Sequence, residues 1–446
     1  MTRLFGTDGV RGEANSVITA EFSLALAVAA SEVLTEGKRD PRPIALLARD
    51  PRASGEFISA AIAAGIASTG VDVLDLGVVP TPAVAHLTAT MDVDFGVMVS
   101  ASHNPMPDNG IKFFDSNGHK LTDEVEDEIE KKISQPRHRP VGADVGRISS
   151  EPHVVGSYLD HLVSTAPHRL DGLKIVVDCA HGAASAIGPA ALRSAGAEVI
   201  LLAAEPDGLN INDGVGSTHL GPLQAAVVEH QADAGVAFDG DADRCLAVDE
   251  NGEIVDGDKI LGILAVAFKA QGNLSDNTLV ATTMSNLGLL RAMEEAGINV
   301  VTTDVGDRYV LAEMVRHGFN LGGEQSGHVL FTDFSTTGDG VLTALQLLGN
   351  LAASQGTLSK LGAHVPKMPQ VMINVPNVEK AKAYTDSGLL GAVLSAEESL
   401  GKTGRILLRP SGTEELVRVM VEAEDLETAQ HWAETLAQEV RERLGN

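Results

Sequence analysis

Continuous apolar runs alternate with helix-like stretches along the first part of the chain. Residues 43–49 (PIALLAR), 71–79 (VDVLDLGVV) and 95–99 (FGVMV) are short apolar runs, which are typical of buried strands. Residues 54–69 (SGEFISAAIAAGIAST) lie between the first two runs and predict a helix with an apolar face. Strands without polar alternation suit a parallel sheet that is covered on both faces. The pattern therefore predicts an α/β domain.

The same pattern begins again twice. The second round predicts strands at residues 173–178, 197–203 and 234–238, with helices at 183–195 and 220–231. The third round predicts helices at residues 259–270 and 286–296, with strands at 279–283 and 299–303. Three successive α/β units of about a hundred residues each are consistent with a degenerate internal repeat.

The end of the chain has a different pattern. Strands are expected at residues 371–375, 405–408 and 417–422, followed by a long helix at 426–444, which favours a small α+β domain. Polar stretches at residues 134–150 and 356–369 are candidate linkers. We expect an α/β protein with mixed or parallel sheets, made of three related domains and a smaller C-terminal domain. The expected boundaries are 1–150, 151–255, 256–365 and 366–446.

Composition narrows the classes of function. Lys and Arg number 33 and Asp and Glu 61, so the net charge of −28 argues against a nucleic-acid partner. Only 3% of residues are aromatic, which also disfavours base stacking. Two cysteines in 446 residues indicate a reducing compartment. No apolar run approaches the ~20 residues that span a bilayer, and the N-terminus lacks a signal-peptide pattern. We expect a cytoplasmic protein without a membrane partner.

The segment DGDADR at residues 239–244 is the strongest candidate metal site. Asp239, Asp241 and Asp243 alternate just after an apolar run, and we expect them to project to one side of an extended loop. Three close carboxylates repel one another unless a cation neutralises them, and hard oxygen ligands suit Mg²⁺ or Ca²⁺. Arg244 stands where an EF-hand loop requires glycine, and the flanks resemble strands, so an EF-hand is excluded. A solvated acidic turn is the alternative.

The segment SASHNP at residues 100–105 carries a candidate nucleophile. Ser102 lies just beyond an apolar strand, where α/β sheets place their reactive loops. A serine hydroxyl needs a base, a metal or a nearby charge to become reactive, and the adjacent His103 cannot be assumed to be that base. A Ser/Asn/Pro turn without chemistry is the alternative.

Three further segments are weaker candidates for ligand binding. RPSGTE at residues 409–414, with Arg418 downstream, can form an anion-binding nest for a phosphate. GGEQSGH at residues 322–328 offers Glu324, Ser326 and His328 to sugar hydroxyls. FGTDGVRG at residues 5–12 is a glycine-rich loop with the single arginine Arg11. Ordinary turns are the alternative for each segment taken alone.

Together, and in this order, these five segments resemble the signature segments of the α-D-phosphohexomutase family over essentially the whole chain. The segments PDGLNIN at residues 206–212, GSTH at 216–219 and VGDRYV at 305–310 resemble the bacterial members that act on glucosamine phosphates. The resemblance implies a heart-shaped molecule with a central cleft. Chance agreement of all these segments is negligible.

The resemblance also implies roles for individual residues. Ser102 would carry the phosphoryl group, and its phosphate oxygen would join Asp239, Asp241 and Asp243 around one Mg²⁺ per chain. Arg244 would lie beside the metal, and Lys112, His328 and Arg11 would act near the reacting oxygen. Glu324 and Ser326 would read sugar hydroxyls. The loop that holds the phosphate not being transferred would comprise Arg409, Ser411, Gly412, Thr413 and Arg418.

The implied activity is the interconversion of glucosamine 6-phosphate and glucosamine 1-phosphate on the route to UDP-N-acetylglucosamine and cell wall. It would proceed through phosphoserine and a glucosamine 1,6-bisphosphate intermediate, in a protein for which the family allows a homodimer. Three alternatives stay open: a phosphomannomutase/phosphoglucomutase of the same family, a non-catalytic phosphosugar sensor, and a metal-dependent phosphatase.

Overall fold

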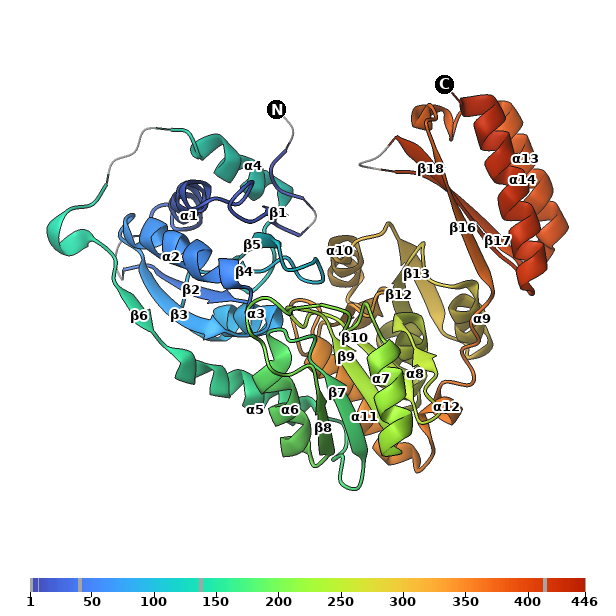
Figure 1. Ribbon diagram of the computed structural model, residues 1–446, viewed down its shortest axis with the longest axis horizontal. Helices are drawn as coiled ribbons and strands as arrows, with labels where there is room; N and C mark the ends of the chain where they lie inside the picture. Colours follow the sequence, from blue (N-terminus) through green and yellow to red (C-terminus); the bar gives the residue numbers. More distant parts are fainter. Residues whose placement is uncertain (1–2, 7, 39–41, 136–138, 412–414, 446) are drawn as a thin grey trace. The chain divides into compact units, whose positions relative to one another are not determined.

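The chain folds into two units. A computed structural model describes residues 3–6, 8–38, 42–135, 139–411 and 415–445. Backbone packing assigns residues 1–284 and 297–364 to the first unit, and residues 285–296 and 365–446 to the second. Among the described residues the first unit holds three sheets and the second holds one (Figure 1). The fold is α/β with mixed sheets and a smaller C-terminal part, which confirms the expected fold class.

The first sheet is mixed and has the strand order β1-β5-β4-β2-β3-β6. The parallel pairs are β2 with β3, β2 with β4 and β3 with β6, whereas β5 runs antiparallel to β1 and β4. The strands are β1 (Val10–Glu13), β2 (Ile44–Arg49), β3 (Asp72–Val78), β4 (Phe95–Val99), β5 (Asp108–Phe114) and β6 (Ile148–Ser150). The helices are α1 (Ala20–Leu34), α2 (Ala53–Ala67), α3 (Thr81–Thr90) and α4 (Asp123–Lys132).

Helices cover both faces of this sheet. Phe95 and Val97 of β4 belong to a core shared with α1, α2 and α4. Gly96, between them, points to the opposite face, where a Cβ would collide with Val84 and Thr88 of α3. Every residue of β4 is buried, which explains why the strand is apolar without alternation.

The second and third sheets also belong to the first unit. The second has the order β11-β10-β9-β7-β8, and the third β13-β12-β14-β15. The second comprises β7 (Lys174–Asp178), β8 (Glu198–Leu202), β9 (Ala234–Phe238), β10 (Cys245–Asp249) and β11 (Ile254–Val255), with α5 (Val155–Thr165), α6 (Ala184–Ala195) and α7 (Gly221–His230). The third comprises β12 (Thr278–Thr282), β13 (Asn299–Thr303), β14 (Leu321–Gly323) and β15 (Val329–Phe331), with α8 (Gly257–Ala270), α10 (Asp307–His317), α11 (Gly340–Ser354) and α12 (Leu358–Leu361).

The second unit is a three-stranded antiparallel sheet with helices. The order is β16-β18-β17. Its elements are α9 (Leu287–Glu295), β16 (Gln370–Pro376), α13 (Ser387–Leu400), β17 (Arg405–Pro410), β18 (Leu416–Glu422) and α14 (Leu426–Leu444). α13 and α14 share one apolar core with the sheet. No described helix is both long and apolar enough to cross a bilayer.

A buried carboxylate ties α9 to the second unit. Glu422 of β18 is fully buried and forms an ion pair with Arg405 Nη2 (2.8 Å). It accepts hydrogen bonds from Arg405 Nε (3.0 Å), the Leu287 backbone N (3.0 Å) and Asn286 Nδ2 (3.2 Å). The N-terminus of α9 therefore finds a partner for its unsatisfied amide in the C-terminal sheet. This bond explains why residues 285–296 pack with residues 365–446 although they lie between β12 and β13.

Replacing Glu422 by Gln should lower the free energy of unfolding of the second unit by about 3 kcal/mol, because Arg405 would lose its charged partner in a buried site. Trp432, the only tryptophan, packs against the core of this unit, so its fluorescence during urea denaturation reports this unit selectively. Glu424→Gln, an exposed change two residues away, is the control. An unchanged midpoint of urea denaturation for Glu422→Gln would contradict the proposed role of Glu422 in holding α9 to the C-terminal sheet.

Candidate functional site

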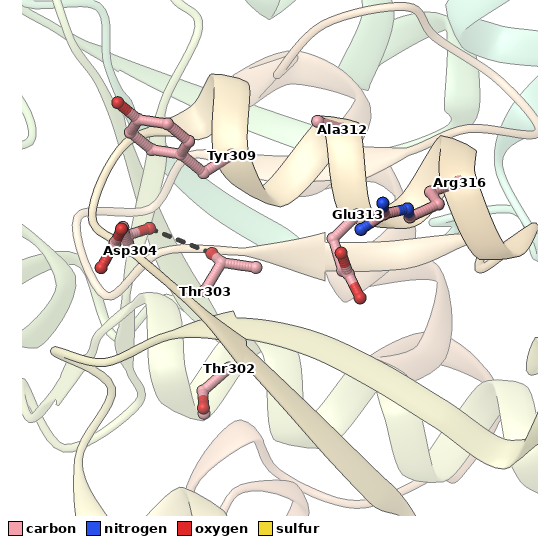
Figure 2. Close-up of a pocket in the computed structure, with 7 residues that line it drawn as sticks. All are labelled: Thr302, Thr303, Asp304, Tyr309, Ala312, Glu313 and Arg316. Atoms are coloured by element: carbon pink, nitrogen blue, oxygen red, sulfur yellow. Dashed lines mark hydrogen bonds between the residues drawn. The ribbon is translucent and has the colours of Figure 1, made fainter.

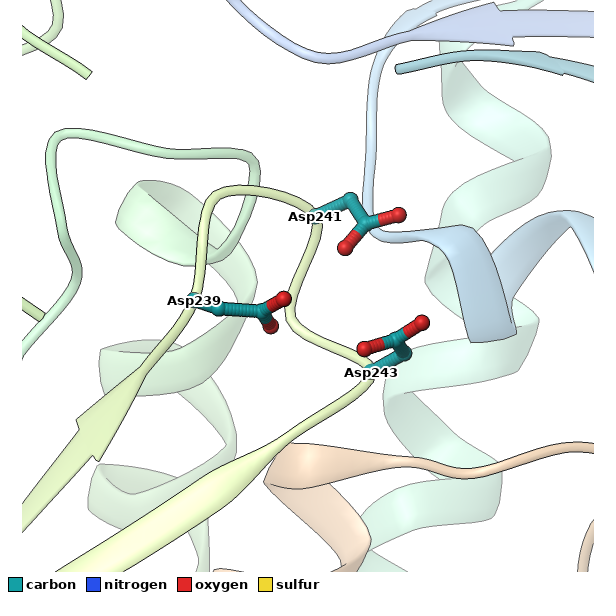
Figure 3. A group of neighbouring side chains, drawn as sticks. All are labelled: Asp239, Asp241 and Asp243. Atoms are coloured by element: carbon teal, nitrogen blue, oxygen red, sulfur yellow. The ribbon is translucent and has the colours of Figure 1, made fainter. Parts of the chain in front are cut away.

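The acidic segment is a tight turn between β9 and β10. Ala242 has φ +59° and its N donates to the Asp239 carbonyl at 3.1 Å, so the backbone folds back on itself. The prediction that this segment is an extended loop is therefore wrong. The carboxylates are brought together by a backbone turn and not by alternation along an extended strand. Figure 3 shows Asp239, Asp241 and Asp243 turned toward one another.

The three carboxylates form a buried group suited to a divalent cation. Asp239, Asp241 and Asp243 are 1%, 0% and 3% exposed, and one oxygen from each lies within 4.8 Å of the others. Oδ1 of Asp241 and Oδ1 of Asp243 are buried and accept no hydrogen bond from any described residue. Burial, followed by the charges of Asp243 and Asp241, raises the pKa of Asp239. Unsatisfied hard oxygens under mutual repulsion fit a Mg²⁺ ion.

Ser102 lies directly against this carboxylate turn. It follows β4, has φ +52°, and donates from Oγ to Asp239 Oδ2 at 2.5 Å. The Gly240 position explains the close approach, because a Cβ there would lie 2.6 Å from the Ser102 carbonyl oxygen. A serine that follows a strand of the first sheet and a carboxylate that follows a strand of the second therefore lie in contact.

A buried arginine holds the serine loop in this strained conformation. Arg52 is fully buried, pairs with Asp50 Oδ2 at 2.9 Å, and donates to the Ser102 carbonyl at 3.0 Å. Asn212 donates to the same carbonyl at 2.9 Å from the second domain, where the first, second and third domains are the parts of the first unit built on its first, second and third sheets. The positive φ of Ser102 persists because donors from two domains over-determine it.

Lys112 neutralises part of the acidic centre. Its Nζ lies 2.8 Å from Asp241 Oδ2, 2.8 Å from Asp8 Oδ2 and 3.6 Å from Asp243 Oδ2. Burial alone would lower the pKa of Lys112, but these carboxylates outweigh it and raise the pKa well above its usual value. The side chain of Lys112 is therefore a cation held in place by carboxylates. Thr81, the first residue of α3, also donates its hydroxyl to Asp241 Oδ2, at 2.6 Å.

His328 brings the third domain to the centre. Its Nδ1 lies 3.6 Å from Asp243 Oδ1 and its Nε2 lies 3.3 Å from Asp307 Oδ2. Burial lowers the pKa of His328, but Asp243 and Asp307 outweigh burial and raise it. Glu324 and Ser326 lie on the same β14–β15 turn, where Ser326 Oγ donates to Glu324 Oε2 at 3.4 Å.

Arg11, His103 and Arg244 surround the same centre. Arg244 Nε lies 3.8 Å from Asp243 Oδ1, and the Arg244 backbone N donates to Asp239 Oδ1 at 3.2 Å. Arg11 pairs with Asp8, the carboxylate that also contacts Lys112. His103 Nδ1 lies 3.4 Å from Ser102 Oγ, and burial followed by the charge of Arg244 lowers the pKa of His103 to about 4. A neutral imidazole therefore lies next to the serine.

The predicted phosphate loop lies in the second unit. Arg409 and Arg418 are directly opposite in the β17–β18 pair, and Ser411 is buried at the end of β17. Two arginines at facing positions place positive charge on one face of this strand pair. Glu415 pairs with Lys380 at 3.1 Å. Gly412 and Thr413 lie outside the described residues.

The sequence motifs did not single out several residues that complete the centre. Asp8 and Asp307 lie within the quoted segments FGTDGVRG and VGDRYV, so membership of a motif was the available signal. Thr81 and Lys120 lie outside every quoted segment. Their roles depend on contacts between domains, which local sequence patterns do not encode.

Two cavities lie outside this centre. One of about 420 Å³ lies between the end of β13 and α10 (Figure 2) and is lined by Thr302, Thr303, Asp304, Tyr309, Ala312, Glu313 and Arg316. The other, of about 470 Å³, is lined by residues that include Arg49, Glu56 and Asp207. Neither cavity is lined by a residue that was predicted to take part in catalysis, metal binding or substrate binding. The candidate site is therefore identified by the charged side chains that meet at the carboxylate turn.

Comparison with known families decides the membership of the chain. Profiles of the phosphoglucomutase/phosphomannomutase family match in succession: alpha/beta/alpha domain I at residues 2–139, domain II at 156–252, domain III at 256–368 and the C-terminal domain at 372–439. The chain belongs to the phosphoglucomutase/phosphomannomutase family. This membership confirms the resemblance that the sequence motifs indicated.

Curated members of this family are similar over their full length. A phosphoglucosamine mutase of Paenarthrobacter aurescens (strain TC1) is 62% identical over 450 residues, covering 100% of this chain and 98% of the relative. A phosphoglucosamine mutase of Streptomyces avermitilis is 58% identical and covers 100% of both chains.

Solved structures of the phosphoglucomutase/phosphomannomutase family share the fold. A family member from Burkholderia thailandensis has a TM-score of 0.81 at 24% identity and covers 98% of each chain. An N-acetylphosphoglucosamine mutase of Aspergillus fumigatus, solved with GlcNAc-6P and magnesium, has a TM-score of 0.69 at 19% identity, covering 98% of this chain and 95% of the other. At these identities the similarity supports the fold alone.

Mg²⁺ should stabilise the protein through the carboxylate turn. At 100 times its Kd, an ion that binds only the folded state adds about 2.7 kcal/mol, which raises the midpoint of thermal unfolding. Asp241→Asn and Asp243→Asn should remove most of this rise, whereas the exposed Asp213→Asn should keep it. An equal rise in all four proteins would show that Mg²⁺ binds elsewhere.

Proposed function

We propose that the chain is an isomerase that interconverts glucosamine 6-phosphate and glucosamine 1-phosphate through a phosphoserine at residue 102 and a glucosamine 1,6-bisphosphate intermediate. The observation that carries this proposal is the position of Ser102 Oγ, 2.5 Å from Asp239 Oδ2 on a turn of three buried carboxylates. A hydroxyl at such a centre is placed to accept and return a phosphoryl group.

The chemistry is two phosphoryl transfers in opposite directions. In the first, the bond between phosphorus and the Ser102 oxygen breaks while a bond to the free sugar hydroxyl forms. The proton of the sugar hydroxyl passes through a basic group lining the centre to the Ser102 oxygen, which becomes a hydroxyl again. The bisphosphate then turns, and its other phosphoryl group returns to Ser102. One Mg²⁺ held by Asp239, Asp241 and Asp243 would screen the charge on the transferred oxygens.

The residues around the centre supply the positive charge that phosphoryl transfer requires. Lys112 is held as a cation by Asp241 and Asp8, and the guanidinium of Arg244 lies beside Asp243. His328 faces Asp243 from the third domain. Fixed positive groups stabilise charge that spreads over the phosphoryl oxygens in the transition state. Arg11 belongs to the same group of charges through Asp8.

Recognition of the substrate needs two further sites. Glu324 and Ser326 offer oxygens to the sugar hydroxyls from the β14–β15 turn. The opposed Arg409 and Arg418, with Ser411, would hold the phosphate that is not being transferred, and Gly412 and Thr413 belong to the same segment. An intermediate that must bind in two orientations requires a phosphate anchor separate from the transfer centre.

The relatives support the choice of substrate. Curated relatives 57–62% identical over the full length of the chain are phosphoglucosamine mutases. The Aspergillus fumigatus enzyme of the same fold was solved with GlcNAc-6P and magnesium, and a serine-to-alanine variant of it was solved with glucose 1,6-bisphosphate. A small phosphosugar is thus the proposed partner. The cytoplasmic location, the homodimer and the domain boundaries 1–150, 151–255, 256–365 and 366–446 stay predictions.

Ser102→Ala should abolish isomerisation of glucosamine 6-phosphate, with a fall in kcat of about 10⁴-fold or more, because the hydroxyl is a covalent participant. Added bisphosphate should not restore turnover. Ser16→Ala, which removes an exposed hydroxyl in the same domain, should retain wild-type activity. A coupled assay of glucosamine 1-phosphate measures both variants.

Two outcomes of this assay would overturn the proposal. Full activity of Ser102→Ala would remove the phosphoserine mechanism. Release of inorganic phosphate at a rate comparable to isomerisation would favour a phosphatase. Parallel assays with glucose 6-phosphate and mannose 6-phosphate test the substrate, since a preference for either would favour the phosphomannomutase/phosphoglucomutase alternative.

A further inference from the structure

A turn of the first domain reaches the third domain beside the catalytic centre. Residues 115–120 follow β5, and the turn closes through a bridge between Phe114 and Lys120. Thr336 of the third domain donates its hydroxyl to the Gly118 carbonyl at 2.7 Å. The tip of this turn therefore contacts the third domain independently of Lys120.

Lys120 joins carboxylates of two domains. Its Nζ lies 2.5 Å from Asp8 Oδ1 in the first domain and 2.6 Å from Asp307 Oδ2 at the start of α10 in the third. The side chain is 16% exposed. Burial would lower the pKa of Lys120, but Asp307 and Asp8 outweigh it and raise the pKa, so the side chain is a cation. A single ammonium thus holds two carboxylates that would otherwise repel one another.

Asp307 passes this contact on to His328. The carboxylate oxygen that accepts from Lys120 also lies 3.3 Å from His328 Nε2. Gly338 also approaches the ring closely, since a Cβ there would lie 2.3 Å from the same nitrogen. The imidazole is therefore confined by the Gly338 backbone and faces the Asp307 carboxylate as a charge partner, without a hydrogen bond.

The residues flanking Asp307 hold the same loop at two more points. The Gly306 N donates to Glu324 Oε1 at 2.9 Å, which fixes the proposed sugar-reading carboxylate. Arg308 Nη1 donates to Asp123 Oδ1 of α4 at 2.6 Å. Three consecutive residues of the third domain thus connect Glu324 and His328 with the first domain.

We infer that Lys120 is a positioning residue: through Asp307 it holds the loops carrying His328 and Glu324 against the Ser102 centre, and it thereby retains the bisphosphate intermediate between the two transfers. The inference rests on the proposed function. Lys112 and Arg11 also contact Asp8, so Asp8 keeps cationic partners when Lys120 is lost. The contact with Asp307 is the one that Lys120 supplies across the domains.

Loss of the contact has a distinct kinetic consequence. When the bisphosphate escapes before the second transfer, Ser102 is left without its phosphoryl group and that molecule stops working. Added bisphosphate phosphorylates Ser102 again and restores it. A positioning role for Lys120 therefore predicts inactivation during turnover that bisphosphate reverses, whereas a purely structural role predicts a loss that bisphosphate does not change.

The test compares progress curves of phosphorylated wild type, Lys120→Met and Lys120→Arg on glucosamine 6-phosphate, with and without glucose 1,6-bisphosphate. Lys120→Met should complete about tenfold fewer turnovers before it stops, which corresponds to about 1.4 kcal/mol less favourable retention of the intermediate. Bisphosphate should restore its steady rate. Lys120→Arg, which keeps the charge, should resemble the wild type, as should the control Lys131→Met on the exposed side of α4.

Asp307→Asn provides a second variant that leaves Lys120 paired with Asp8, so no cation is left buried without a partner. It decides the matter if Lys120→Met does not fold, and it should show the same reversible inactivation. The inference would be overturned if either folded variant completed as many turnovers before inactivation as the wild type. It would also be overturned by a slow rate that bisphosphate does not improve.

These outcomes are separate from those of the proposed function. If the wild type does not isomerise the substrate, or if Ser102→Ala remains active, the proposed function is wrong whatever Lys120 does. If the wild type isomerises through Ser102, and either Lys120→Met or Asp307→Asn folds and remains active for as many turnovers as the wild type, only the role of Lys120 is wrong.

Discussion

Mutual repulsion among three buried carboxylates is the constraint around which the first unit is organised. At 4.8 Å, two carboxylates repel by about 3 kcal/mol at an effective dielectric constant of about 20, and the turn holds three such pairs. A protein keeps such a group only if cations compensate for it. Lys112 supplies one positive charge, and Oδ1 of Asp241 and Oδ1 of Asp243, which accept no hydrogen bond from a described residue, are oxygens that a divalent ion could bind. The arrangement is costly for folding, which is typical of sites kept for chemistry.

The compensation comes from the first and third domains of the first unit. Lys112 and Thr81 reach Asp241 from the first domain, and His328 faces Asp243 from the third. The serine loop is held from both sides by Arg52 and Asn212, so its strained backbone is fixed before any ligand arrives. Preorganised charge and a fixed hydroxyl are what a phosphoryl-transfer centre needs, because the reaction itself then requires little rearrangement.

Sequence patterns predicted the parts of this structure that are encoded locally. The apolar runs that became β4 and β9 are fully buried strands, and the helix expected at residues 54–69 is α2. The pairing of β5 against β4 was beyond reach, because residues 108–114 are polar at one end and antiparallel pairing depends on the long-range partner. The candidate linker at residues 134–150 ends in β6, which adds to the first sheet beside β3.

The site shows the same division between local and long-range information. Ser102 and the three aspartates stood out because their residue types and spacing carry chemistry by themselves. Lys120 did not, because its importance arises only when Asp8 and Asp307, almost 300 residues apart, meet at its ammonium. The alternating aspartates were assigned correctly to one cluster for the wrong geometric reason, since Ala242 bends the chain into a turn. Neither the contacts of Lys120 nor the bend at Ala242 can be deduced from composition or from hydrophobic periodicity.

The most direct test of the account is to locate the phosphoryl group. The dephosphorylated protein is incubated with glucose 1,6-bisphosphate, with or without Mg²⁺, and its peptides are analysed by mass spectrometry. Because Ser102 Oγ is the serine hydroxyl that contacts the carboxylate turn, the account predicts one phosphoryl group on Ser102, gained only with Mg²⁺ and lost in Asp243→Asn. Phosphorylation at another residue, or equal labelling of Ser102 without the ion or without Asp243, would contradict the account.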